Sequence, residues 1–210
     1  ITECYKEIQI ILEEEISIKE KSEHKFVGKP KRLRKNDVDI NIQSLSFQLS
    51  GGIDLSAIEG VGIGTIMTFI SEVGFDMTSF KTAKHFVSWL RLAPNKKISG
   101  GKVLSSYTKS GRNRLAAAFR QAANGVSNLR KGGMLHQFFK RIEYRKGRLS
   151  AILATARKLA VIFWTIIAKK IAYNPIPPQQ YLDRIRQNQV RHLKRKIKQL
   201  NIKIEEIDFA

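Results

Sequence analysis

Residues 54–74 read DLSAIEGVGIGTIMTFISEVG, and this stretch predicts a short helix, a glycine-rich turn and a second helix. Gly60, Gly62 and Gly64 permit positive φ angles and close backbone approach. The N–H groups that open the second helix are therefore expected to stay accessible to an anion, as in a helix-hairpin-helix phosphate clamp. A glycine-rich turn between two packed helices would have the same sequence, so both interpretations stay open.

The segments around this stretch predict a mainly α fold with four parts. Residues 1–20 place apolar side chains at helical spacing among glutamates, which indicates an amphipathic, coiled-coil-like helix. Residues 21–50 are basic and polar and predict a linker. Residues 51–175 are expected to form one helical domain that contains the helix-hairpin-helix-like element. Residues 176–210 then predict a basic helical tail.

Within the helical domain, two amphipathic segments flank a long polar stretch. The first predicted helix covers residues 79–92, with its N-cap at Thr78 or Ser79. Pro94 ends it, and helical spacing resumes only over residues 112–129. The intervening residues 93–111 predict a loop, and loops of this length inside a domain are usually functional.

A long apolar run, residues 149–168, has the length of a membrane span. Arg157 and Lys158 would lie at its centre, where charge is costly in lipid. We therefore predict a buried core helix and no membrane as partner. A basic helix over residues 134–144 precedes this run, and a strongly basic helix over residues 181–200 follows it.

The charge balance indicates a polyanionic partner. The chain has 38 basic and 18 acidic side chains, a net charge of +20 and a pI near 10.2. From Met77 to Ile142 it has fourteen Lys and Arg and no Asp or Glu. Such a surface neutralises phosphates and releases their counterions, which favours DNA or RNA. A merely soluble basic face, an anionic membrane surface and a ribosome- or RNA-associated structural protein are the alternatives.

Cysteine and carboxylate usage argues against a self-contained metal site. Cys4 is the only cysteine, so the chain has no disulfide framework or Cys-based metal site, and we expect a reducing, intracellular setting. Metal-dependent phosphodiester chemistry needs several oxygen ligands brought together. The few carboxylates near the glycine turn are explained adequately by helix capping and solvation; they are Asp54, Glu59, Glu72 and Asp76.

A serine between small and basic residues is the leading candidate nucleophile. Ser99 precedes Gly100 and Gly101, which allow a bulky phosphate to approach the hydroxyl closely. Nearby cations could neutralise charge on a transferring phosphoryl group; they are Lys96, Lys97, Lys102, Lys109, Arg112 and Arg114. No activating base is visible, so Ser99 and its glycines could instead form a simple anion-binding nest. Ser105 is the runner-up nucleophile, and Ser106 and Ser110 compete less well.

Several motifs together resemble one family of bacterial insertion-sequence transposases. They include the IEGVG turn at residues 58–62, the ISEVG segment at 70–74, and TAKHFVSWL at 82–90. They continue with KISGGKVLS at 97–105 and with ATARKLA at 154–160. This family pairs a RuvC-like N-terminal domain with a serine-bearing C-terminal domain and is related to Piv-type DNA invertases. The resemblance spans about residues 50–200 and does not include residues 19–50.

The resemblance implies a recombinase that cuts and rejoins DNA, with Ser99 as the family's serine and a phosphoserine link as intermediate. It also implies that acidic residues of a RuvC-like domain bind Mg²⁺, while this chain itself binds no cofactor or metal. The chain starts without Met and has no leader, so we expect a C-terminal fragment of a bacterial, cytoplasmic, nucleoid-associated protein. DNA is the expected partner, with a guide-like noncoding RNA in some members, and a homo-oligomer is expected.

The predicted function is therefore the DNA-binding and strand-transfer portion of a transposase. In this interpretation the turn at residues 60–64 grips backbone phosphate and Ser99 attacks the scissile phosphate. The alternative is a non-catalytic nucleic-acid-binding module from a truncated or decayed element.

Overall fold

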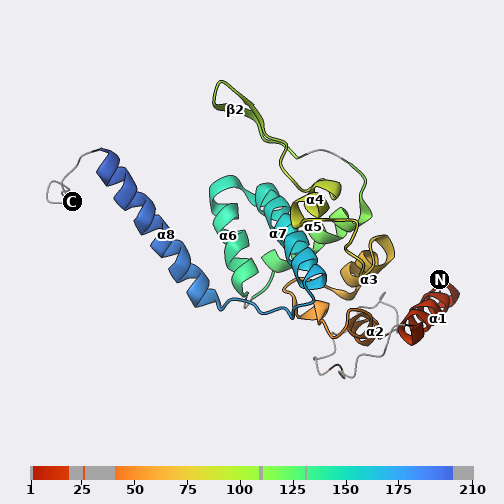
Figure 1. Cartoon of the computed structure of the whole chain (residues 1–210). Coiled ribbons are helices and arrows are strands. Elements are labelled where there is room, and N and C mark those ends of the chain that lie inside the picture. Colours follow the sequence, from red (N-terminus) through yellow and green to blue (C-terminus); the bar gives the residue numbers. More distant parts are fainter. Residues whose placement is uncertain (1, 19–25, 27–40, 109–110, 131, 201–210) are drawn as a thin grey trace. The chain divides into compact units, whose positions relative to one another are not determined.

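The computed structural model describes residues 2–18, 26, 41–108, 111–130 and 132–200, and side chains of the first helix from Glu7 to Ser17. It confirms a mainly α fold. The chain divides into two units, residues 1–174 and 175–210, each of which is described by itself. Figure 1 shows the helices and the single small β-hairpin.

The core of the first unit forms around the longest apolar helix. This helix, α7 (Arg148–Ala168), packs against α4 (Ala83–Trp89), α5 (Arg114–Ser127) and α6 (Met134–Lys146) (Figure 1). Phe163 of α7 is fully buried, with its ring centroid 5.0 Å from that of Phe119. By length and composition α7 is the only helix in the described ranges that could cross a membrane. Its packing against three helices instead fits the predicted core helix.

The glycine-rich stretch forms a 3₁₀ turn followed by one helix. The turn, η1, covers Leu55–Ala57, and α3 covers Ile63–Glu72 and packs on α5. Asp54 caps η1, because its side chain accepts a 2.8 Å hydrogen bond from the Ser56 backbone N–H. The predicted first helix is therefore only three residues long.

The N-terminal segments differ in part from expectation. The predicted amphipathic helix is α1 (Thr2–Ile18), which contacts α2 (Ile42–Leu49). Helix α2 lies inside the stretch expected to be a linker; Asn41 caps it, and Ile42, Leu45 and Leu49 are buried. Most of the predicted linker, residues 21–25 and 27–40, lies outside the described residues, as do residues 19 and 20 of the predicted helix.

Two further boundaries were wrong. Helix α4 begins at Ala83 and not near Ser79, because the hydroxyl of Thr82 accepts the hydrogen bond from His85 N–H that caps it. The predicted loop 93–111 contains an antiparallel hairpin of β1 (Lys97–Ser99) and β2 (Lys102–Ser105). Strands this short give too few residues for an alternating pattern to be recognised.

The second unit contains one long basic helix. Helix α8 (Pro178–Gln199) starts with proline at its first position, where a missing N–H costs nothing. None of its residues is buried, and its last turn contains Lys196 and Lys198. It agrees with the basic helix predicted for the tail, whereas the final residues 201–210 lie outside the described part.

Candidate nucleic-acid interface

Gly100 and Gly101 form the tip of the hairpin, with φ angles of +53° and +74° (Figure 1). A two-residue turn with both φ values positive is the type I′ turn, whose twist matches that of the flanking strands. Residues with a Cβ rarely adopt this conformation. The geometry of the turn is therefore sufficient to explain why both positions are glycine. Their predicted second role, which is to let a phosphate approach Ser99, is an additional one.

Ser99 is the last residue of β1 and is exposed to solvent. Its register partner across the turn is Lys102. Directly opposite residues of an antiparallel pair have Cβ atoms about 4.5–5.5 Å apart and lie on one face. The Lys102 ammonium can therefore reach an anion at the Ser99 hydroxyl. None of the described side chains forms a hydrogen bond with this hydroxyl, so a general base is not evident in this part of the chain.

The other predicted site residues occupy the two ends of the same segment. Lys96 and Lys97 are exposed at the start of the hairpin, and Arg112 and Arg114 are exposed at the start of α5. The α5 terminus is ordered by Asn113, whose side chain accepts a 2.8 Å hydrogen bond from the Ala116 N–H. Ser105 is half-buried at the end of β2 and Ser106 is exposed, whereas Lys109 and Ser110 lie outside the described residues.

The three glycines of the turn have different roles. Only Gly60 has a positive φ, +77°. A Cβ at Gly60 would collide with the Val126 side chain and lie 2.6 Å from the Ala122 carbonyl oxygen, so this residue allows close packing on α5. Gly62 caps α3 in an extended conformation and Gly64 lies within the helix, both with open space around them. Phosphate binding by this turn remains a prediction.

Three of the four acidic residues near the turn accept hydrogen bonds from backbone N–H groups. Asp54 caps η1, and the Asp76 carboxylate accepts a 2.9 Å hydrogen bond from the Thr78 N–H. Glu59 accepts from backbone N–H groups at the start of α6. No three His, Cys, Asp or Glu side chains among the described residues come together as a metal site. The resemblance assigns Mg²⁺ to a RuvC-like domain and not to this segment, and that assignment stays a prediction.

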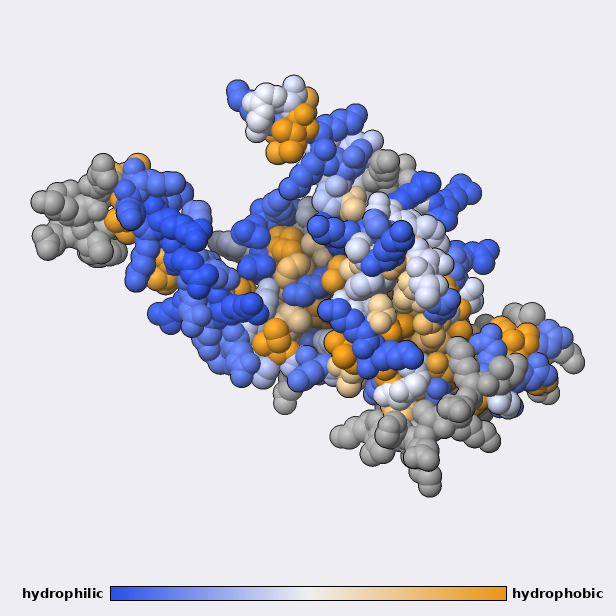
Figure 2. Space-filling view, in the orientation of Figure 1, coloured by the Kyte–Doolittle hydropathy of each residue, from blue (hydrophilic) through white to orange (hydrophobic). Residues whose placement is uncertain are grey.

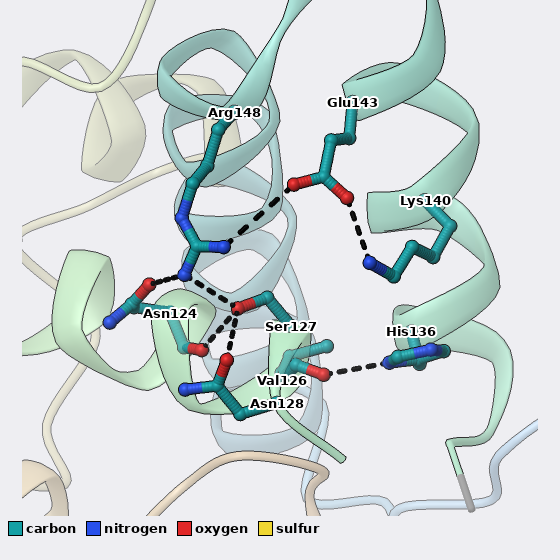
Figure 3. Close-up of polar contacts among 8 residues, drawn as sticks. All are labelled: Asn124, Val126, Ser127, Asn128, His136, Lys140, Glu143 and Arg148. Carbon is teal, nitrogen blue, oxygen red and sulfur yellow. Dashed lines mark hydrogen bonds and ion pairs between the residues drawn. The ribbon is translucent and has the colours of Figure 1, made fainter. Parts of the chain in front are cut away.

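A polar network that sequence reasoning missed connects α5, α6 and α7 (Figure 3). Arg148 donates to the side chains of Asn124 at 2.7 Å and Ser127 at 3.2 Å. Its other terminal nitrogen lies 3.9 Å from Glu143, which also forms a 2.9 Å ion pair with Lys140. These contacts use the one carboxylate of α6 for helix packing, so they position the helices and carry no evident chemistry.

The segment that contains the turn and the hairpin is similar to known proteins. Residues 54–140 match the model of the transposase IS116/IS110/IS902 family. The chain is 34% identical over 116 residues to the pilin gene-inverting protein of Moraxella bovis, an alignment covering 54% of this chain and 35% of that protein. It is 26% identical over 124 residues to a probable family 20 transposase of Pseudomonas aeruginosa, covering 58% and 36%.

The aligned part of the chain thus spans about a third of the length of these curated relatives. No solved structure is similar to the chain. The matched segment contains Ser99, the hairpin and the glycine turn, which are the features that carried the resemblance in the sequence. Through this segment the chain is similar to the insertion-sequence transposases of the IS116/IS110/IS902 family and to the pilin gene-inverting proteins.

Proposed function

We propose that this chain is the DNA-binding and strand-transfer portion of a transposase or site-specific recombinase, with Ser99 as nucleophile. The observation that carries the proposal is the position of Ser99 on an exposed basic hairpin, opposite Lys102. The matched relatives are named as a transposase and a gene-inverting protein, which supports chemistry on DNA.

In the proposed reaction, the Ser99 Oγ attacks the phosphorus of a phosphodiester and displaces a sugar hydroxyl. The product is a phosphoserine ester that keeps the bond energy, so attack by another sugar hydroxyl can rejoin strands without an external energy source. Lys97 and Lys102 neutralise charge that develops on the phosphoryl oxygens. The serine proton passes to a base outside the described residues.

The proposal assigns the remaining parts of the active site to other elements of the full protein. A RuvC-like domain would hold Mg²⁺ with its own carboxylates, and Mg²⁺ supplies charge neutralisation at the phosphate when it is bound. Arg112 and Arg114 hold the DNA backbone beside the hairpin. DNA is the proposed partner, a homo-oligomer and a guide-like noncoding RNA are further proposed partners, and the cytoplasm is the proposed location.

The test joins this chain to a RuvC-like domain and supplies Mg²⁺ and DNA bearing the ends of the element. Wild type should recombine the DNA and form a protein–DNA adduct that survives denaturing electrophoresis. Ser99→Ala should lose both products while keeping its DNA affinity. The matched control Ser79→Ala, at an exposed serine outside the hairpin, should keep all three properties. Equal recombination by Ser99→Ala would refute the nucleophile assignment.

A non-catalytic nucleic-acid-binding module is the second candidate. It is favoured by the Ser99 hydroxyl having no hydrogen-bond partner among the described side chains, since serine is a weak nucleophile without activation. This candidate predicts that wild type and Ser99→Ala bind DNA equally and that neither forms an adduct.

A further inference from the structure

A basic groove lies where the start of the hairpin meets α6 and α7. It has a volume of about 600 Å³, within the range of ligand pockets. Among the described residues, its walls contain apolar side chains such as Leu92, Phe138 and Ile142, but no carboxylate. Figure 2 shows hydrophilic and hydrophobic patches side by side on this face. Five cations line the groove; they are Lys96, Arg145, Lys146, Arg157 and Lys158.

Two lining residues of the groove, Phe138 and Lys158, bring positive charge close to an aromatic ring, and Arg141 lies near the same ring. The Lys158 ammonium lies 4.4 Å from the centroid of the Phe138 ring, and the Arg141 guanidinium lies 5.7 Å from the same centroid. Burial, and then the charge of Arg141, lower the pKa of Lys158 below its usual value. Holding these cations close together therefore costs free energy, which an anion entering the groove would reduce.

We infer that this groove binds the phosphodiester backbone of a single nucleic-acid strand next to the segment that reaches Ser99. A basic groove with an aromatic side chain and apolar walls is the arrangement that binds single strands, because phosphates meet the cations while sugars and bases contact apolar surface. The groove is as small as a ligand pocket, so it suits one strand and not a duplex.

The hairpin sets the distance between the groove and Ser99. Lys96 lines the groove and immediately precedes β1, so Ser99 follows it by three residues. An extended strand rises about 3.3 Å per residue, which separates the two by about 10 Å. At about 3.4 Å per nucleotide along one stacked strand, this corresponds to about three nucleotides. The inference rests on the proposed function, since it assigns the groove to the strand that Ser99 attacks.

The experiment measures binding of the 210-residue chain to fluorescent single-stranded DNA, RNA of the same sequence and duplex DNA by anisotropy over a salt series. The test variant is Lys146→Gln/Arg157→Gln, which removes two exposed groove cations. The control is Lys84→Gln/Lys169→Gln, which removes the same charge from exposed positions outside the groove lining. Circular dichroism melting confirms that both variants fold.

If the groove binds a strand, the test variant loses about two phosphate contacts, and the log–log salt slope for single strands becomes shallower by about 1.4. The affinity advantage of wild type then falls about sevenfold between about 50 and 200 mM salt. The control should change neither quantity. An effect on DNA at least as large as on RNA supports the groove as the site of the strand that Ser99 attacks, whereas a larger effect on RNA would contradict that assignment.

The results that would overturn the inference have different meanings. If wild type binds DNA and both double variants have the same slope, the groove is not the binding site while the proposed function survives. If wild type binds none of the three nucleic acids at low salt, the proposed function fails as well. A larger effect on duplex than on single strands would also contradict the single-strand assignment.

Discussion

The carboxylate of Glu59 accepts a hydrogen bond of 3.1 Å from the backbone N–H of Gly133, which lies 74 residues later in the chain. The same oxygen accepts from the His136 N–H at 3.3 Å, so Glu59 caps the N-terminus of α6 from the glycine turn. The negative charge also complements the positive end of the helix dipole. One side chain thus holds the glycine turn against the start of α6.

Glu59→Ala should destabilise the chain by about 1–2 kcal/mol, because α6 loses its only side-chain cap among the described residues. Glu59→Gln keeps an acceptor oxygen and should lose less. Glu72→Ala, on the exposed end of α3, is the matched control and should change stability by less than about 0.5 kcal/mol. Urea unfolding followed by circular dichroism gives the three values, and similar losses for Glu59→Ala and Glu72→Ala would contradict the capping role.

Gly60→Ala and Gly64→Ala should have opposite effects on stability. Alanine at residue 60 would need a positive φ and would collide with α5, which should cost more than about 1 kcal/mol. Alanine at residue 64 faces open space in an exposed turn of α3 and should stabilise by up to about 1 kcal/mol. Thermal melting checks both signs. In the same samples, weaker DNA binding by Gly64→Ala would support the predicted phosphate binding at this turn. Unchanged DNA binding would contradict that prediction.

The hairpin predicts a difference between two double substitutions of Gly100 and Gly101. Asn-Gly suits a type I′ turn and should keep DNA recombination by the joined protein. Ala-Ala disfavours positive φ at both positions and should abolish recombination. Because the residues of the hairpin are mostly exposed, neither variant should change the melting temperature by more than about 2 °C. If Asn-Gly also fails, the first glycine serves phosphate approach and not turn geometry.

The long helices could be predicted from the sequence because their apolar residues recur over several turns. Helices α5, α6 and α7 begin and end within a few residues of the expected boundaries. Helix α2 was missed, although Ile42, Leu45 and Leu49 have helical spacing, because serine and glutamine between them resemble a linker. The start of α4 was placed too early, since several residues before Ala83 can serve as a cap.

The candidate site could be predicted only in its composition. Charge distribution and the Ser-Gly-Gly sequence identified Ser99 and its neighbouring lysines, but the pairing of Ser99 with Lys102 depends on the turn type. The groove around Lys158 could not be predicted, because it joins side chains from three separate segments. The one signal in the sequence was the Arg157-Lys158 pair inside an otherwise apolar helix. Burying these two charges in a core costs too much free energy unless their side chains reach a polar surface.

Tyr173 should make the chain lose stability in strongly alkaline solution. Burial, and then the charge of Glu59, raise the pKa of Tyr173 to about 12 from an ordinary value of 10.0. Between these values the unfolded chain loses its phenol proton and the folded chain keeps it, so stability is complete below pH 10 and falls as the pH rises toward 12. Urea unfolding over this range should show a smaller loss for Tyr173→Phe than for wild type. In Glu59→Gln the pKa of Tyr173 should fall only in part, because burial is the larger cause of its shift, and the ultraviolet absorbance of the phenolate reports the change. If wild type and Tyr173→Phe lose the same stability between pH 10 and pH 12, the pKa of this hydroxyl is not raised.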